Sequence, residues 1–438
     1  MAAPFAHLVE GKNLLPVILG GDIGGYSLAR AFHEAFGVKS IIMSTALGGT
    51  VRDSAIVINV VEPGMDSPEV AVAALKRIAA AHPGAALIAM GSADWLVRIL
   101  VENREQLPEY VVPYVDKELL DRVTSKEAFA ELCVEYGLAH PRTVVVSLGS
   151  GVPDAGAGLF SELTFPVVAK AADSGAFHAV EFAGKEKVAY VASPAELVDL
   201  LGRVVEAGYR DAFIVQDFIP GDDAGLRIFN TYCSSAGAVE WTVYGHVLLQ
   251  EHTPSTVGNS SIVLTEPAPA AIEPFLRLLE GIGWRGFASP DMKVDPRTGE
   301  LVFFELNPRL SRSNYFVTAS GVNPAVAYVR DWLLGLPPSE EECGGPQKQA
   351  VFTVVPRWIM DRYVIDADIR ARVKALRRSG SVKNPLWNPA ERHPRRLAYV
   401  AAHQLNQIRK YRTFYPRSVQ AAEREAIEGM PFPRGSNA

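Results

Sequence analysis

The feature that most constrains the fold is a pair of alternating segments around a tight turn, at residues 287–307. The turn is predicted at residues 295–299, whose sequence Asp-Pro-Arg-Thr-Gly is typical of turns. If it centres near residue 298, residue 291 lies opposite residue 305, and residue 293 opposite residue 303. Side chains alternate along strands, so one face carries Asp291, Lys293, Phe303, Glu305 and Asn307. The other face carries Met292, Val294, Val302, Phe304 and Leu306, an apolar set that predicts burial.

Three oxygen-bearing side chains on the polar face predict a metal site. Facing residues in a hairpin have Cβ atoms about 5 Å apart, and two carboxylates that close resist joint ionisation unless a cation lies between them. Asp291, Glu305 and Asn307 offer hard oxygen ligands, which suit Mg²⁺ rather than zinc. Three such ligands leave coordination positions for water and phosphate oxygens. The alternative is a solvated hairpin face with scattered charges.

Three basic side chains are candidates for binding phosphate. Arg309 follows the hairpin directly and can hold phosphate or carboxylate oxygens bidentately, although a plain surface charge is the alternative. Lys170 ends an apolar strand, where an ammonium needs a partner, either a phosphate or a local salt bridge. Lys126 lies in the first turn of a helix that Thr124 is expected to cap, with Glu127 at the third helical position. Phosphates favour helix N-termini, but a lysine there opposes the helix dipole.

Polar residues at the end of another apolar strand are candidates for binding a nucleotide. A flat base can rest on Phe218 and Ile219 while backbone groups read its edge, and Asp223 can accept hydrogen bonds from ribose hydroxyls. The alternative is a strand end followed by an acidic turn. The residues assigned to the nucleotide are Lys126, Lys170, Gln216, Asp217, Phe218, Ile219, Asp223 and Lys293.

The first part of the chain predicts a parallel sheet. Strands are expected at residues 14–19, 40–43 and 86–90, with a glycine-rich turn at 20–25 and a helix at 27–36. Such a turn can hold a pyrophosphate, but the second strand ends in Ser and Thr, without an acid to hold a ribose. A Rossmann-like domain with a role other than NAD binding is therefore expected.

Composition restricts the class of protein. No apolar run is long enough to span a bilayer, and the N-terminus has neither the basic start nor the apolar stretch of a signal peptide. Three widely spaced cysteines argue against a disulfide framework and a zinc cluster, so a reducing cytoplasm is expected. The net charge is -6, yet residues 351–417 carry 15 Lys and Arg against 4 Asp and Glu. This basic segment predicts either contact with an anionic molecule or packing against the acidic body.

In chain order, these candidates resemble the motif set of the ATP-grasp superfamily. That set has a lysine on a helix, a lysine ending a strand, an adenine-binding strand with a ribose acid, and an Asp before Glu-x-Asn-x-Arg. The matching positions are Lys126, Lys170, residues 216–223, Asp291 and residues 305–309, and the resemblance covers roughly residues 16–335. It implies an α/β ATP-grasp fold that binds ATP and Mg²⁺, with an N-terminal Rossmann-like domain.

A closer resemblance is to the peptidoglycan D-aspartate ligase branch. The segments that carry it are residues 165–170, 214–223, 245–249, 253–259, 286–293 and 316–318. It implies that ATP phosphorylates the β-carboxylate of D-aspartate, and that the lysine amine of UDP-MurNAc-pentapeptide attacks the acyl phosphate. By the same resemblance, Lys126 and Lys170 hold the phosphates, and Arg309 stabilises the tetrahedral intermediate. Cell-wall precursors make peripheral membrane contact compatible with this function, whereas no nucleic-acid motif is present.

The resemblance also implies a Rossmann-like domain at 1–121 and the ATP-grasp domain at 122–335. Outside that core, a Pro, Glu and Gly rich stretch predicts a linker at 336–349, and the basic residues after it predict a C-terminal extension at 350–438. The lid of the ATP-grasp domain is expected near 165–212. Its loop at 173–178 has one glycine, fewer than is usual in the superfamily.

The sequence leaves other functions open. A ligase for another amino acid, a dipeptide-forming enzyme and a carbamoyl-phosphate-synthase-like enzyme would share the same motifs. A nucleotide-binding regulatory or scaffold protein without turnover would be expected to lack some of the metal ligands or lysines, and a kinase-like transfer to a hydroxyl is more remote. The sequence does not set the oligomeric state.

Overall fold

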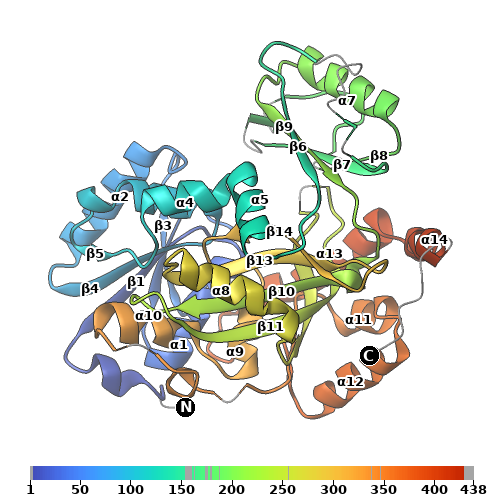
Figure 1. The fold of residues 1–438 in the computed structure, drawn as a ribbon. Helices are drawn as coiled ribbons and strands as arrows, with labels where there is room; N and C mark the ends of the chain where they lie inside the picture. Colours follow the sequence, from blue (N-terminus) through green and yellow to red (C-terminus); the bar gives the residue numbers. More distant parts are fainter. Residues whose placement is uncertain are drawn as a thin grey trace.

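The described residues of the fold, seen in a computed structural model, form three sheets and their covering helices (Figure 1). The structure describes residues 3–152, 160–161, 163–172, 176–177, 180–186, 188–254, 256–336, 338–345 and 347–428. In this part of the chain, no helix combines the length and apolarity needed to cross a bilayer. The loop predicted at 173–178 lies largely outside the described residues, because 173–175 and 178 are not among them.

The N-terminal sheet is parallel, as predicted, and its strand order is β3-β2-β1-β4-β5. Its strands are β1 (Asn13–Leu19), β2 (Ser40–Ser44), β3 (Val57–Val61), β4 (Ala85–Gly91) and β5 (Tyr110–Val111). Its helices are α1 (Ile23–Phe36), α2 (Pro68–Ala81), α3 (Asp94–Glu102) and α4 (Lys117–Thr124). The chain changes direction across the sheet between β1 and β4, and ligands of open parallel sheets bind outside the carboxyl ends of strands at such a point.

Two predicted helix starts are wrong. Helix α1 begins at Ile23 rather than Ser27, because Asp22 caps it by accepting the N–H of Gly25, which makes part of the expected turn helical. Thr124 does not cap α5 (Lys126–Glu135); it ends α4 and donates its hydroxyl to the carbonyl of Leu120. The cap is Ser125, so Glu127 lies at the second helical position and not the third.

A seven-stranded sheet forms the centre of the molecule, in the order β14-β13-β10-β11-β12-β15-β16. Its strands are β10 (Leu226–Cys233), β11 (Val239–Gln250), β12 (Ser260–Glu266), β13 (Gly286–Val294), β14 (Leu301–Asn307), β15 (Val351–Thr353) and β16 (Val382–Lys383). All neighbours are antiparallel except β15 and β16. Beside it lie α8 (Glu273–Gly281), α9 (Tyr315–Ser320) and α10 (Pro324–Tyr328).

A smaller antiparallel sheet projects from this body, at the top right of Figure 1. Its order is β6-β9-β7-β8, and it carries α7 (Pro194–Glu206). The strands are β6 (Thr143–Ser147), β7 (Val167–Ala171), β8 (Ala189–Val191) and β9 (Ala212–Asp217). The apolar strand predicted to end at Lys170 lies in β7, and the one predicted to carry Gln216 and Asp217 lies in β9, so the two are neighbours in one sheet.

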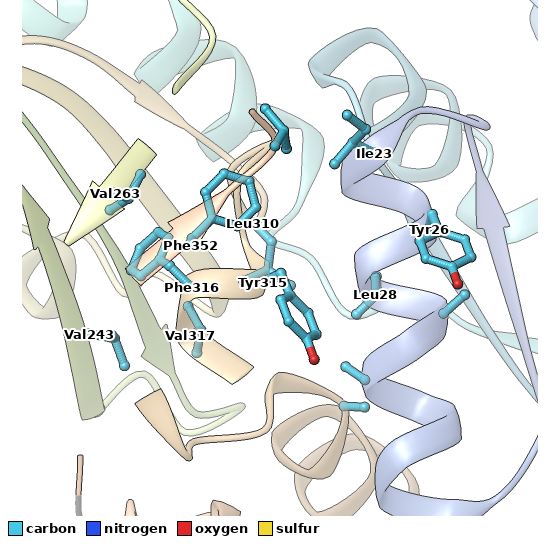
Figure 2. Close-up of a cluster of buried hydrophobic side chains, with 14 of the residues drawn as sticks. Ile23, Tyr26, Leu28, Val243, Val263, Leu310, Tyr315, Phe316, Val317 and Phe352 are labelled. Atoms are coloured by element: carbon cyan, nitrogen blue, oxygen red, sulfur yellow. The ribbon is translucent and has the colours of Figure 1, made fainter. Parts of the chain in front are cut away.

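One apolar core joins the N-terminal and central sheets. Figure 2 shows Ile23 and Leu28 on α1 on one side of this core, and Phe316 on α9 with Val263 on β12 on the other. These four side chains are at most 5% exposed. Burial on this scale supplies the main stabilisation of the fold and fixes the position of the parallel sheet against the central sheet.

The C-terminal segment completes the central sheet instead of standing apart from it. Strand β15 pairs with β12, and the segment also contains α11 (Arg357–Tyr363), α12 (Ala367–Arg378), α13 (Pro394–Phe414) and α14 (Arg417–Glu428). Cys343, inside the predicted linker, is fully buried in the same core. The domain boundaries remain a prediction, but removal of the residues after 349 would take two strands, β15 and β16, out of the central sheet.

A buried arginine connects this segment to the N-terminal domain through hydrogen bonds, an ion pair and a stacking contact. Arg396 on α13 is fully buried, donates to the carbonyl of Gly49 at 2.9 Å and also bonds that of Thr50. Its guanidinium stacks on Tyr26 at 4.6 Å and lies 3.9 Å from Glu391. Glu391 in turn accepts the hydroxyl of Tyr26.

Arg396→Met should therefore destabilise the protein strongly, because it leaves the buried Glu391 carboxylate without its cation. Breaking such a pair typically costs about 3–5 kcal/mol. A thermal melt should show a large fall in Tm, whereas the exposed neighbour gives a matched control, Arg395→Met, with little change. Equal melting temperatures for the two variants would show that Arg396 does not stabilise the contact between the C-terminal segment and the N-terminal domain.

Candidate active site

The hairpin of β13 and β14 brings the predicted metal ligands together. Asp291 pairs with Glu305, and Ser289 with Asn307, as the alternation predicted for this end of the hairpin. The amide of Asn307 donates to the carbonyl of Ser289 at 2.9 Å, with 3.4 Å between Nδ2 of Asn307 and Oδ2 of Asp291. The three predicted ligands thus share one face of one hairpin.

Towards the turn, the predicted register is wrong. A β-bulge between Asp291 and Met292 makes Phe304 an extra residue, so Lys293 pairs with Val302 and not with Phe303. Phe303 therefore points into the core and stacks on Phe275, with ring centroids 5.1 Å apart. Phe304, predicted to face the core, is only half-buried. The bulge confines the polar face to the end of the hairpin that carries the carboxylates.

The two carboxylates are electrostatically unequal. Burial and the neighbouring charge of Glu305 raise the pKa of Asp291 above its ordinary value. The Lys126 ammonium, with help from Lys170, holds the pKa of Glu305 well below its ordinary value, although burial opposes this. Glu305 is thus the permanent anion of the pair, and Asp291 resists ionisation in the absence of a further cation.

This donor set fits a magnesium ion that also binds phosphate. It offers two carboxylates and an amide oxygen, which are ligands that Mg²⁺ accepts. Within the described part of the chain, no group of three or more His, Cys, Asp or Glu side chains could hold a metal. A cation between Asp291 and Glu305 would therefore need further oxygens from water or a phosphate, as expected where the ion travels with a nucleotide.

The two predicted lysines both approach Glu305 from outside the central sheet. Lys126 is the first residue of α5 and forms an ion pair with Glu305. Lys170 lies on β7, one residue before its end, and is close enough to lower the pKa of Glu305. The fold thus places an ammonium from the small sheet and one from a helix N-terminus beside the acidic face.

The predicted base-binding strand is partly engaged in contacts within the protein. Gln216 is buried and donates its amide to the hydroxyl of Thr143 at 2.8 Å. Asp217 forms an ion pair with Arg142 at 2.8 Å, so its carboxylate stabilises the small sheet. The ring of Phe218 meets the edge of Tyr190, and the ammonium of Lys293 lies 5.7 Å from its centroid.

Past this strand, the predicted ribose acid is also paired. Asp223 accepts the backbone N–H of Gln250 at 2.9 Å and lies 2.8 Å from Nε2 of His252. Lys293 donates to the carbonyls of Ile219 and Gly221. A cavity of about 320 Å³ lies beside this segment and is lined by Gly221, Asp222, Ala224, Gly225, Arg227, Val294, Pro296 and Arg424.

Arg309 lies at the carboxyl edge of the parallel sheet and is held there by an acid that the sequence reasoning missed. Its Nε and Nη2 atoms lie 2.9 Å from the two carboxylate oxygens of Asp94, the first residue of α3. Burial opposes the charge, but the Asp94 carboxylate raises the pKa of Arg309. Nη2 also approaches the amide oxygen of Asn307 at 3.3 Å. The arginine therefore adjoins the hairpin face that carries the predicted ligands Asp291, Glu305 and Asn307, which we call the metal-ligand face.

Two further acids, Asp22 and Glu251, lie near this edge, and the sequence analysis did not identify them as site residues. Asp22 follows β1, as Asp94 follows β4, and Arg312 reaches both Asp22 at 3.6 Å and Glu251 at 3.2 Å. An available signal was the predicted parallel sheet, because acids that follow neighbouring parallel strands lie at one edge of the sheet. The partner of each arginine, however, depends on long-range packing.

Comparisons with solved structures show the fold. An L-amino acid ligase from Bacillus licheniformis superposes with a TM-score of 0.54 at 15% identity, covering 78% of this chain and 79% of that one. A phosphoribosylglycinamide synthetase from Anaerococcus prevotii gives 0.54 at 14% identity, with 78% and 80% covered. A carboxyaminoimidazole ribonucleotide synthase from Aspergillus clavatus, in complex with ATP, gives 0.53 at 13% identity, with 77% and 81% covered. The predicted α/β ATP-grasp fold is confirmed, and this class of proteins binds ATP.

Among curated proteins, a D-aspartate ligase from Enterococcus faecium (strain Aus0004) is 31% identical over 415 residues, which cover 92% of this chain and 98% of the relative. No protein-family model matches the chain. With a relative of this identity and coverage, the chain belongs to the D-aspartate ligase family of ATP-grasp enzymes. It is an ATP-dependent carboxylate–amine ligase, which excludes the regulatory protein without turnover as an alternative.

Asp291→Asn should raise the thermal stability of the metal-free protein. The carboxyl group has a raised pKa in the folded chain, so it costs stability once the pH exceeds the ordinary Asp value near 3.8, and the full cost is present above the folded-state pKa. At pH 8 with a chelator, we expect Tm to increase by about 2 °C or more.

The same hairpin supplies a control. Asp295 is buried, but its bonds to Arg297 lower its pKa, so Asp295→Asn should decrease Tm under the same conditions. A fall in Tm for both variants would contradict the unfavourable environment assigned to Asp291.

Proposed function

We propose that this enzyme uses ATP and Mg²⁺ to join the β-carboxylate of D-aspartate to the lysine amine of a peptidoglycan pentapeptide precursor. The precursor is proposed to be UDP-MurNAc-pentapeptide. A carboxylate oxygen attacks the γ-phosphorus of ATP, and ADP leaves. The amine nitrogen then attacks the acyl carbon, phosphate leaves, and the nitrogen loses a proton, which yields an amide.

The observation that carries the chemistry is the pairing of Asp291 with Glu305 across the hairpin, beside Lys126 and Lys170. Two carboxylates paired across a hairpin suit a divalent cation, and two ammonium groups beside Glu305 suit a phosphate chain. The substrate assignment is supported by the D-aspartate ligase relative, whose sequence aligns along nearly its whole length with this chain.

Each residue can be given a role in phosphoryl and acyl transfer. Asp291, Glu305 and Asn307 would hold Mg²⁺, which supplies charge neutralisation at the phosphate oxygens. Lys126 and Lys170 would exchange Glu305 for phosphate oxygens when ATP binds. Arg309, fixed by Asp94, would direct its positive charge at the oxyanion of the tetrahedral intermediate.

The nucleotide would lie between the small sheet and the central sheet. Phe218, Ile219 and the backbone at the end of β9 are proposed to contact the base, with Gln216 and Asp217 holding this strand in place. Asp223 is proposed to accept from ribose hydroxyls, in competition with His252, and Lys293 supports the intervening turn through its bonds to Ile219 and Gly221.

The direct test is to incubate the protein with ATP, Mg²⁺, D-aspartate and UDP-MurNAc-pentapeptide, and to determine the mass of the product. The expected product is the precursor plus one aspartyl residue, formed together with one ADP. A parallel panel of other amino acids distinguishes the D-aspartate reaction from that of a dipeptide-forming or other amino-acid ligase. ADP release with a different carboxylate, and none with D-aspartate, would contradict the proposed substrate.

Glu305→Gln and Asn307→Ala should each lower the rate of ADP formation by about 100-fold or more, because each removes a proposed ligand of the metal that would stabilise the charge developing on the phosphate oxygens. Both variants should keep a native circular dichroism spectrum, since neither side chain fills the core. Near wild-type turnover with ordinary Mg²⁺ dependence would show that these residues do not bind the metal.

Lys170→Ala should weaken ATP binding more than it lowers stability, measured by nucleotide titration beside thermal melting. Lys185 of the same small unit gives a control, because its ammonium donates to the carbonyl of Val180 and lies 5.3 Å from the ring of Phe177. Lys185→Ala should lower Tm and leave ATP affinity nearly unchanged. A large loss of Tm with unchanged affinity in Lys170→Ala would favour a structural salt bridge instead.

A further inference from the structure

A line of alternating charges runs from the C-terminal helix α13 to the edge of the parallel sheet. Lys410 on α13 lies 3.8 Å from Oε2 of Glu251, and Arg312 lies 3.2 Å from Oε1 of the same carboxylate. Arg312 then approaches Asp22, which follows β1, at 3.6 Å. Two cations from separate parts of the chain are therefore organised around one buried acid.

Glu251 is the centre of this line. It directly follows β11 and is 3% exposed, and its Oε2 atom has no hydrogen-bond partner among the described residues. The crevice between it and α13, which Gln407 also lines, is too narrow to admit a water molecule. The Lys410 ammonium, 3.8 Å away, thus helps to compensate the charge at Oε2, and a buried carboxylate without compensation would be costly.

Arg312 retains donors for a further partner. Its contact with Asp22 is long, and Asp22 already accepts the N–H of Gly25 as the cap of α1. The guanidinium side chain is 26% exposed, at the point of the parallel sheet where strand order reverses. Arg309 lies three residues earlier in the same loop, and the loop is fixed between them because the N–H of Ser311 donates to Asn230 at 2.9 Å.

We propose that Arg312 binds the second, unreactive carboxylate of a dicarboxylic amino-acid substrate, and that Lys410 is a positioning residue that holds Arg312 through Glu251. This inference rests on the proposed function and assigns the substrate class to a particular side chain. One carboxylate of the substrate reacts near Arg309 and the metal-ligand face. The second carboxylate needs a cation that lies within the length of the substrate from the reacting carboxylate. A guanidinium suits it because it binds carboxylates bidentately.

The inference also gives the C-terminal segment a role in specificity. Without α13, Glu251 would lose Lys410, and its remaining charge would draw Arg312 away from the sheet edge. Lys410 would thus act on substrate affinity without touching the substrate. Deletion of the segment cannot test this, because it removes β15 from the central sheet, so point variants are required.

The test compares D-aspartate with β-alanine, which is the same molecule without the α-carboxylate. ADP release is measured with each in the presence of ATP, Mg²⁺ and the acceptor. In Arg312→Gln, kcat/KM for D-aspartate should fall by about 100-fold, whereas that for β-alanine should change by less than about threefold. The KM for ATP should be unchanged, and Arg312→Lys should recover part of the preference.

Lys410→Met keeps the aliphatic stem and removes the charge. It should raise the KM for D-aspartate by about 10-fold with little effect on kcat, KM for ATP or β-alanine turnover, and Lys410→Arg should restore the KM. The exposed neighbour provides the matched control, Arg409→Met, which should behave as the wild type.

The outcomes separate the two proposals. If wild-type protein turns over D-aspartate but Arg312→Gln loses both substrates equally, the specificity role is overturned and the proposed function stands. If Lys410→Met and Arg409→Met are indistinguishable, the positioning role of Lys410 is overturned. If the wild type turns over no dicarboxylic amino acid, both the proposed function and this inference are wrong.

Discussion

The geometry of the proposed active site depends on holding Asp291 and Glu305 side by side across two paired strands. Backbone hydrogen bonds of the hairpin hold the two residues opposite each other, and the register keeps both side chains on the same face. Lys126 stabilises one of the two charges, so the site without a metal stores an unfavourable interaction at Asp291. A divalent cation would relieve it, which would make metal binding and phosphate binding favourable at the same place.

Much of the hairpin site and of the parallel sheet was predictable from the sequence because strand alternation is a local property. It placed Asp291, Glu305 and Asn307 on one face, and the alternation of strands and helices gave the parallel sheet. The bulge that turns Phe303 into the core was not predictable, since packing against Phe275, distant in sequence, accompanies the extra residue in β14. The cap at Ser125 was missed because adjacent Thr and Ser are both good caps, and α4 extends through Thr124.

The pairing of charges was the least predictable part of the site. Asp94 and Arg309 are 215 positions apart, and Glu251 and Lys410 are separated by most of the C-terminal half. Likewise, the excess of basic residues suggested a surface for an anionic molecule, yet Arg396 is fully buried and Arg372 pairs with Glu266. Charge counts along a segment cannot distinguish a binding surface from cations that hold separate domains together.

ATP bound at the metal-ligand face is proposed to phosphorylate a substrate carboxylate before the amine attacks. D-aspartate labelled with ¹⁸O in its β-carboxylate tests this directly, because the attacking oxygen stays with phosphorus when the amide forms. The measurement is mass spectrometry of the inorganic phosphate released in a complete reaction with ATP, Mg²⁺ and the pentapeptide acceptor. We expect one ¹⁸O atom in each phosphate for every amide formed, and amide formation with unlabelled phosphate would contradict an acyl-phosphate intermediate.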